Sequence, residues 1–181
     1  MSLALGILER RLSYSHKAFI FDSVSFEREL APLLRLALTQ DEPKLLISFI
    51  ETNRHSLRDP YEGEPLSPQW QSLLSSGDVQ ELGDFALTRY YQPTEDFGVA
   101  ENWNNLLESL PEAICSALLG DPLVEVGTSF DPGRMGSYFQ SPSKAVESLR
   151  VLQGSVFSNL EAFISGLSKA VNLGHGIYVT F

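Results

Sequence analysis

The sequence predicts an α+β fold: a predominantly helical single domain over residues 1–181, with a small sheet of three or four short strands that includes the C-terminal strand. Apolar residues recur at helical spacing along most of the chain, most regularly over 155–171. A short alternating segment, 177–181, ends the sequence as a strand. Hydrophobic residues make up 43% and charged residues 20% of the chain, which is typical of a folded globular protein.

The N-terminal third predicts one strand and a pair of helices. Residues 3–12 fit a short helix or a strand, and residues 18–21 (AFIF) fit a strand. Apolar residues over 26–38 share one helical face, but Pro32 interrupts it, so we expect a kink or two short helices that meet there. A further helix over 43–54 completes a helical hairpin.

The middle of the chain alternates between loops and short helices. Proline and glycine predict a loop at 58–66, and an acidic, aromatic loop follows at 90–98. Between them, Ser67-Pro68 predicts a helix that ends at Gly77, and Asp78 with Glu81 three residues later predicts the capped start of another. Later elements are expected as helices at 103–110, 111–119 and 142–152 and as strands at 123–126 and 137–140.

The segment 129–152 is the densest in local signals. Asp131-Pro132-Gly133 predicts a turn in which Gly133 takes a positive φ angle. Ser141-Pro142 predicts the capped start of a helix. The strand before it, 137–140, is expected to pair with the C-terminal strand, which makes this segment a scaffold.

Negative charge is concentrated in the middle of the sequence. The net charge is −10 overall, 0 over residues 1–50, −11 over 51–125 and +1 over 126–181. Because an acidic surface repels phosphate backbones, nucleic-acid binding is disfavoured. The charge is explained either by a solvated face or by a docking surface for a basic protein partner.

The acidic loops and one arginine supply the candidate binding residues. Paired acids beside aromatic side chains are typical of protein-binding surfaces. Neither loop has the spacing of a calcium-binding loop, and no metal ion or cofactor is expected. Arg134 follows the glycine turn and could reach an acid of the middle segment. The candidate binding residues are Glu62, Glu64, Tyr91, Glu95, Asp96 and Arg134.

Catalytic signatures are missing from the sequence. It contains no phosphate-binding glycine loop, no dinucleotide fingerprint and no nucleophile elbow, and its three histidines form no metal-binding motif. The alternative to a binding protein is a small hydrolase-type enzyme with a site around His55, Asp59 and the loop carboxylates. The single cysteine, Cys115, sits in an apolar helical run and suits a reducing cytoplasm.

The leading hypothesis is a non-enzymatic binding protein that engages a basic protein through residues 51–125, as inhibitor- or immunity-type proteins do. Such small, acidic, helix-rich sequences are common among bacterial cytosolic proteins. No window is long and apolar enough to cross a membrane. A third interpretation is a homo-oligomer in which 177–181 is an exposed edge strand that pairs with its own copy.

Overall fold

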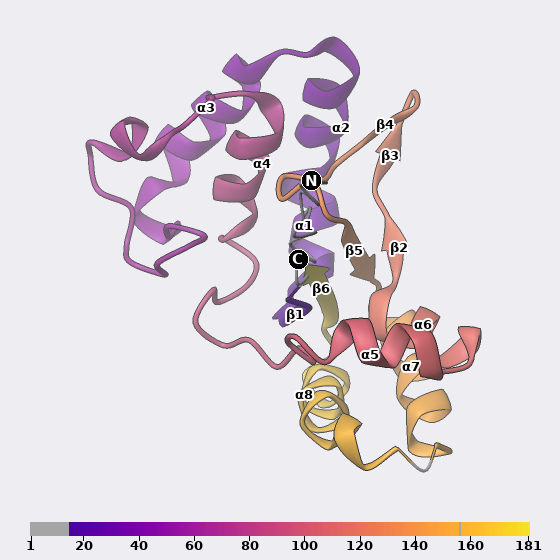
Figure 1. The fold of residues 1–181 in the computed structure, drawn as a ribbon. Helices are drawn as coiled ribbons and strands as arrows, with labels where there is room; N and C mark the ends of the chain where they lie inside the picture. The colour runs from indigo at the N-terminus through magenta and orange to yellow at the C-terminus, as the bar shows by residue number, and fades with distance from the viewer. Residues whose placement is uncertain (1–14, 156) are drawn as a thin grey trace, which may run out of the picture.

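A central antiparallel sheet organises the protein, which we describe from a computed structural model over residues 15–155 and 157–181 (Figure 1). The segment 3–12 lies outside the described residues. The sheet has the order β1-β6-β5-β2. Its strands are β1 (Lys17–Phe21), β2 (Asp121–Pro122), β5 (Ser137–Gln140) and β6 (Gly176–Thr180). The strands β3 (Val124–Glu125) and β4 (Thr128–Ser129) form a separate hairpin.

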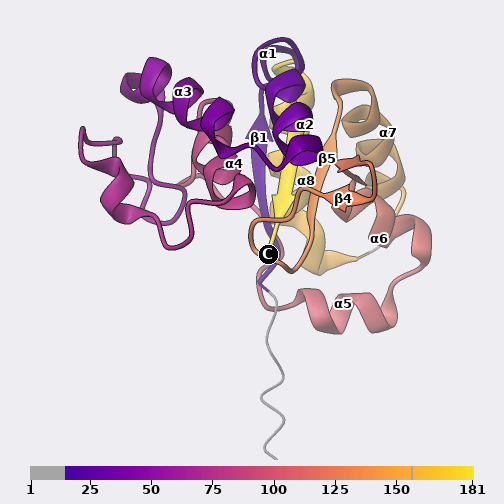
Figure 2. The ribbon, with the colours of Figure 1, turned by 90° about the horizontal axis from the view of Figure 1, so that it is seen from above.

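Helices cover both faces of the sheet, as Figure 2 shows from above. The first face is covered by α1 (Ser23–Glu29), α2 (Ala31–Gln40), α3 (Pro43–Asn53) and α4 (Val79–Leu87). The second is covered by α5 (Trp103–Ser109), α6 (Glu112–Leu119), α7 (Pro142–Gln153) and α8 (Glu161–Asn172). The predicted α+β class with a small sheet is therefore confirmed.

The alternation of side chains along each strand divides the apolar interior into two cores. Phe21 of β1 and Tyr178 of β6 belong to the first core, which the helices α1 to α4 complete. Ala18 of β1 and Val179 of β6 belong to the second core, which α5 to α8 complete. Because both faces are covered, the longer strands β1 and β6 carry apolar residues at most positions and show little polar alternation.

Most predicted elements are present. The apolar stretch at 26–38 is broken at Leu30 into α1 and α2, with Pro32 in the first turn of α2, as the position of proline led us to expect. The strands 137–140 and 177–181 pair as β5 and β6. The helix expected at 67–77 is wrong in extent, because only Trp70–Leu73 form a short 3-10 turn, η2.

The expectation that 177–181 is an exposed edge strand is wrong. The strand β6 pairs with β1 on one side and β5 on the other, so its main-chain hydrogen-bonding groups are used within the chain. The sequence could not show this position, because strand order depends on long-range pairing. Self-association by the pairing of this strand with its copy has no free edge to use.

The turn at 131–136 also differs from the expectation in one detail. Arg134 and Gly136, with φ angles of 58° and 110°, take the positive angles, whereas Gly133 does not. Gly133 instead allows close approach, because a β-carbon built there would lie 2.8 Å from the carbonyl oxygen of Phe181. The Asp131 carboxylate accepts hydrogen bonds from the N–H groups of Met135 and Gly136.

Among the described residues, no helix has both the length and the apolar character needed to cross a membrane. This agrees with the absence of a long apolar window in the sequence.

The first prediction concerns the packing of β6 on its neighbours. A β-carbon at Gly176 would collide with the carbonyl oxygen of Gln140 and the hydroxyl of Ser23. We expect Gly176→Ala to lower the free energy of unfolding by about 3 kcal/mol, measured by urea denaturation, because such overpacking forces the backbone apart. Gly154→Ala is the control: a β-carbon there makes only ordinary contacts of 3.6 Å, so a change under about 1 kcal/mol is expected. Equal stabilities for the two variants would contradict the packing described.

Candidate functional site

The segment 90–100 runs along the outer edge of β1 and closes much of it. The N–H of Asp22 donates to the carbonyl of Tyr90 at 2.9 Å, and the N–H of Phe97 donates to the carbonyl of Ala18 at 2.9 Å. The N–H of Ala18 donates to the Asp96 carboxylate at 2.9 Å. The acidic loop predicted at 90–98 is therefore held against the sheet at both of its ends.

Between these attachments the edge of β1 is open at Ile20. Residues on alternate positions of an antiparallel strand point their main-chain groups to the same side. Ala18 and Asp22 point theirs outward to the loop, so the N–H and C=O of Ile20 also point outward. Within the described chain nothing hydrogen-bonds to them. This opening is one residue long, which is enough for one peptide group but too short to add a strand.

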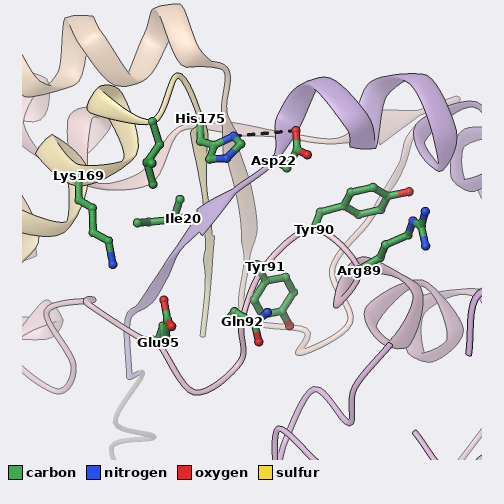
Figure 3. Close-up of a pocket in the computed structure, with 10 residues that line it drawn as sticks. Ile20, Asp22, Arg89, Tyr90, Tyr91, Gln92, Glu95, Lys169 and His175 are labelled. Atoms are coloured by element: carbon green, nitrogen blue, oxygen red, sulfur yellow. Dashed lines mark ion pairs between the residues drawn. The ribbon is translucent and has the colours of Figure 1, made fainter. Parts of the chain in front are cut away.

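A cavity of about 250 Å³, which we call the edge cavity, lies at this opening (Figure 3). Glu95 of the loop and Lys169 of α8 both point into it, and Asp22 and His175 meet at its far side. The edge cavity is lined by Ile20, Asp22, Arg89, Tyr90, Tyr91, Gln92, Glu95, Lys169, Leu173 and His175.

The charges in the edge cavity are mixed, and several are already engaged. His175 Nδ1 lies 3.9 Å from Asp22 Oδ1, and Asp22 also accepts a hydrogen bond from the N–H of Ser25 at the start of α1. Burial raises the pKa of Asp22, but the hydrogen bonds from Ser25 and the nearby positive charges outweigh this and lower it. Arg89 is paired with Glu29 at 3.2 Å. The edge cavity thus provides a polar binding surface, with no serine, threonine or cysteine nucleophile among its lining residues.

A second cavity, of about 100 Å³, lies on the other side of the same loop, and we call it the Asp84 cavity. Asp84 of α4 is the only acid in its wall and Lys17 of β1 is the only base. The rest of the wall consists largely of aromatic side chains and proline rings. The full lining is Lys17, Phe19, Pro60, Tyr61, Asp84, Tyr91, Pro93, Pro132, Gly133, Thr180 and Phe181.

Asp84 is partly buried and makes no hydrogen bond or ion pair with the described part of the chain. Its burial raises the pKa of the carboxyl to about 7; the positive charge of Lys17 opposes this shift, and the acids Asp59 and Glu81 add to it. A carboxyl group titrating near neutral pH in a cavity is a recognised mark of a functional site. Burial also raises the pKa of the neighbouring phenols of Tyr61 and Tyr91, and the nearby Asp84 carboxylate adds to both shifts.

The two acidic loops, 58–66 and 90–98, lie against each other although they are far apart in the sequence. A β-carbon built on Gly63 would be 2.5 Å from Cγ2 of Thr94, so these residues are in close contact. Pro60 and Tyr61 of the first loop and Pro93 of the second line the Asp84 cavity. Both loops therefore contribute to the wall of this cavity.

The predicted binding residues fall into four groups. Glu62, Glu64 and Glu95 are exposed. Asp96 is exposed too, but its carboxylate accepts hydrogen bonds from the N–H groups of Ala18 and Gly98, so it holds the loop in place. Tyr91 is only 6% exposed and lines both cavities.

Arg134 is exposed in the turn at 131–136. Pro132 and Gly133 of that turn line the Asp84 cavity, but Arg134 itself does not. It lines a different cavity, together with Trp103 and Tyr138. The structure thus brings five of the six candidates to one region and leaves Arg134 out of it.

The residues of the alternative, enzymatic hypothesis share none of the cavities described above. His55 is exposed in the 3-10 turn η1 (Arg54–Ser56) and lines none of the cavities described above. The Asp59 carboxylate accepts hydrogen bonds from the N–H groups of Tyr61 and Glu62, which fixes the turn of the first loop. Within the described ranges, no group of three or more His, Cys, Asp or Glu residues is arranged to hold a metal ion.

His16 is fully buried and structural. Its Nε2–H donates to the carbonyl of Leu118 at 2.9 Å, and its Nδ1 accepts from the N–H of Val99 at 3.2 Å. Both ring nitrogens are thereby satisfied in the neutral form, and burial lowers the pKa of the imidazole.

Comparison with protein-family models, curated proteins and solved structures finds no match to this chain in any of the three. The interpretation of the site therefore depends on its own geometry.

Asp84 is the main site residue that sequence reasoning missed. A signal for it existed: α4 is buried at nearly every position, and only Gln80 and Asp84 are partly exposed. A charged residue in a helix that is buried on nearly every side has to face either a cavity or a partner. The signals at Asp78 and Glu81 predicted only the start of this helix and said nothing of Asp84.

The second prediction concerns the pH dependence of stability. The pKa of Asp84 rises from an ordinary value of 3.8 to about 7, so the folded state disfavours its charged form. Relative to Asp84→Asn, the wild type should lose stability as the pH rises from about 4 to 7, and the difference should stay constant above that. We expect Asp84→Asn to raise the Tm by about 10 °C at pH 8, for a gain of about 4 kcal/mol, and by much less at pH 4. A difference in Tm that does not change between these pH values would contradict the assignment.

Proposed function

We propose that the protein binds a basic protein partner through the loops 58–66 and 90–98. No catalytic role is assigned to this surface. We also place the protein in the cytoplasm, where its single cysteine, Cys115, stays reduced.

The observation that carries the proposal is that two loops in contact with each other hold three exposed carboxylates with no ion-pair partner among the described residues. Some acids elsewhere form ion pairs, such as Glu29 with Arg89 and Asp121 with Lys144. Others, such as Glu108, form none within the described chain. What distinguishes the loop acids is that two neighbouring loops carry them. The loop acids are Glu62, Glu64 and Glu95.

The surroundings of these acids support a protein as the partner. Tyr61 is 69% exposed beside Glu62, and an exposed tyrosine is among the residues most enriched in protein interfaces. The Asp59 turn and the Asp96 hydrogen bonds hold both loops in place, so little ordering is needed on binding. Like charges gathered on one surface also speed the approach of a basic partner, an effect that salt weakens.

The third prediction tests this surface with a basic peptide of known composition. Fluorescein-labelled nona-arginine is titrated with the protein at low ionic strength, and binding is measured by fluorescence anisotropy. We expect the variant Glu62→Gln/Glu64→Gln/Glu95→Gln to bind about tenfold more weakly than the wild type, because each close charge pair contributes of the order of 0.5 kcal/mol.

The control variant removes three exposed carboxylates from the other side of the sheet: Glu108→Gln/Glu147→Gln/Glu161→Gln. Its net charge equals that of the loop variant, so a general effect of charge would weaken both equally. We expect less than a twofold change for this control. Asp96 is left intact, because its replacement would free the loop from β1. Equal losses in the two variants would overturn the proposal.

A further inference from the structure

We infer that the Asp84 cavity receives one arginine side chain of the partner, with the guanidinium placed against the Asp84 carboxylate and between the rings of the cavity wall. The inference rests on the proposed function and adds an anchor beside the acidic loops.

The size of the cavity fits such a group. About 100 Å³ corresponds to the volume of about three water molecules, which is close to that of a planar guanidinium with its four heavy atoms. Pro60, Tyr61, Tyr91 and Pro93 of loops 58–66 and 90–98 form part of its wall, so the cavity lies beside the acidic loops. Phe19, Tyr91 and Tyr178 form a packed aromatic group behind it, with ring centroids 4.7 Å apart for Phe19 and Tyr91 and 5.3 Å for Tyr91 and Tyr178.

The chemistry of the wall selects a cation. Asp84 is a carboxylate without a partner in the described chain, and a carboxylate removed from water is stabilised most by an opposite charge at contact distance. Tyrosine faces also attract cations, most often arginine, when these lie within about 6 Å of the ring. The groups that face Asp84 from the surrounding elements are Lys17 of β1, Asp59 and Tyr61 of the first loop, Glu81 of α4, Tyr91 of the second loop and Tyr178 of β6.

Arginine fits this set better than lysine. Its guanidinium is flat and weakly hydrated, so it can stack on rings while donating to a carboxylate, whereas an ammonium group keeps its water more strongly. The one base nearby, Lys17, is exposed and forms no ion pair with Asp84, which leaves the carboxylate free for an incoming group. An acidic side chain would repel the Asp84 carboxylate, and a neutral side chain would leave its negative charge without a counter-charge.

The test uses single residues in place of a whole partner. N-acetylarginine amide, N-acetyllysine amide and N-acetylcitrulline amide are each titrated into the protein, and amide shifts are followed by NMR. Citrulline has the shape of arginine without the charge. At pH 8 we expect arginine to bind with a Kd of about 1 mM and to shift the amide signals of Tyr61, Tyr91 and Lys17. Citrulline should bind at least tenfold more weakly, and lysine should lie between them.

Asp84→Asn should weaken arginine binding at least tenfold, and Glu108→Gln should leave it unchanged. Wild-type affinity should fall about tenfold for each pH unit below about 7, as Asp84 takes up a proton, and that dependence should vanish in Asp84→Asn. The Tm measured for Asp84→Asn confirms that this variant is folded.

Arginine binding that is equal in the wild type and Asp84→Asn, or equal for arginine and citrulline, would overturn the inference. The proposed function has a separate readout, because nona-arginine binding depends on Glu62, Glu64 and Glu95. If nona-arginine binding is lost in the loop variant but kept in Asp84→Asn, the result supports the acidic loops as the docking surface and contradicts the arginine site at Asp84. If arginine binds at Asp84 while nona-arginine binds the loop variant normally, the cavity is a cation site and the acidic surface is not the docking site.

Discussion

The strand β6 is the element on which the rest of the structure depends. Its main chain is hydrogen-bonded to β1 and β5, and its side chains are divided between the two cores, with Ile177 and Val179 in one and Tyr178 in the other. A strand that is buried on both faces and both edges has no polar surface left, so function has to be placed at the margins of the sheet. The margin nearest to it is the outer edge of β1.

That margin explains why the acidic loops lie where they do. An edge strand exposes a row of hydrogen-bonding groups that a protein has to cover. Segment 90–100 covers β1 with main-chain bonds at both ends and with the Asp96 carboxylate, leaving only Ile20 open. Gly63 then lets the first loop pack directly on Thr94 of the second. The acidic surface is therefore a consequence of how the edge of the sheet is covered.

The fold was largely predictable from local pattern, and the site only in part. The break near Pro32, the strands 18–21 and 137–140 and the Asp78–Glu81 helix start all follow from short-range signals, and the structure has each of them. Asp78 caps the helix by accepting from the N–H of Glu81, but the Glu81 carboxylate accepts from the N–H groups of Ser75, Ser76 and Gly77 and not from that of Asp78. Strand order and the contact between the acidic loops depend on pairings between distant parts of the chain, which no window of sequence contains. This is why β6 was misplaced at an edge and why Asp84 was missed.

Asp84 also shows how a stable scaffold can carry an unfavourable group. The helix α4 is buried nearly all round, and Leu82 and Phe85 on either side of the acid belong to the first core, so the helix position is fixed whatever the state of the carboxyl. Its charged form is disfavoured in the folded protein, so Asp84 lowers stability near neutral pH and is of no use to the fold itself. A cation that enters the cavity would offset the unfavourable free energy of the charged carboxylate. Part of its binding free energy would therefore come from relieving an unfavourable charge that the free protein already carries. On this view the acids on the loops attract a basic partner from a distance, while Asp84 distinguishes arginine from other side chains at contact.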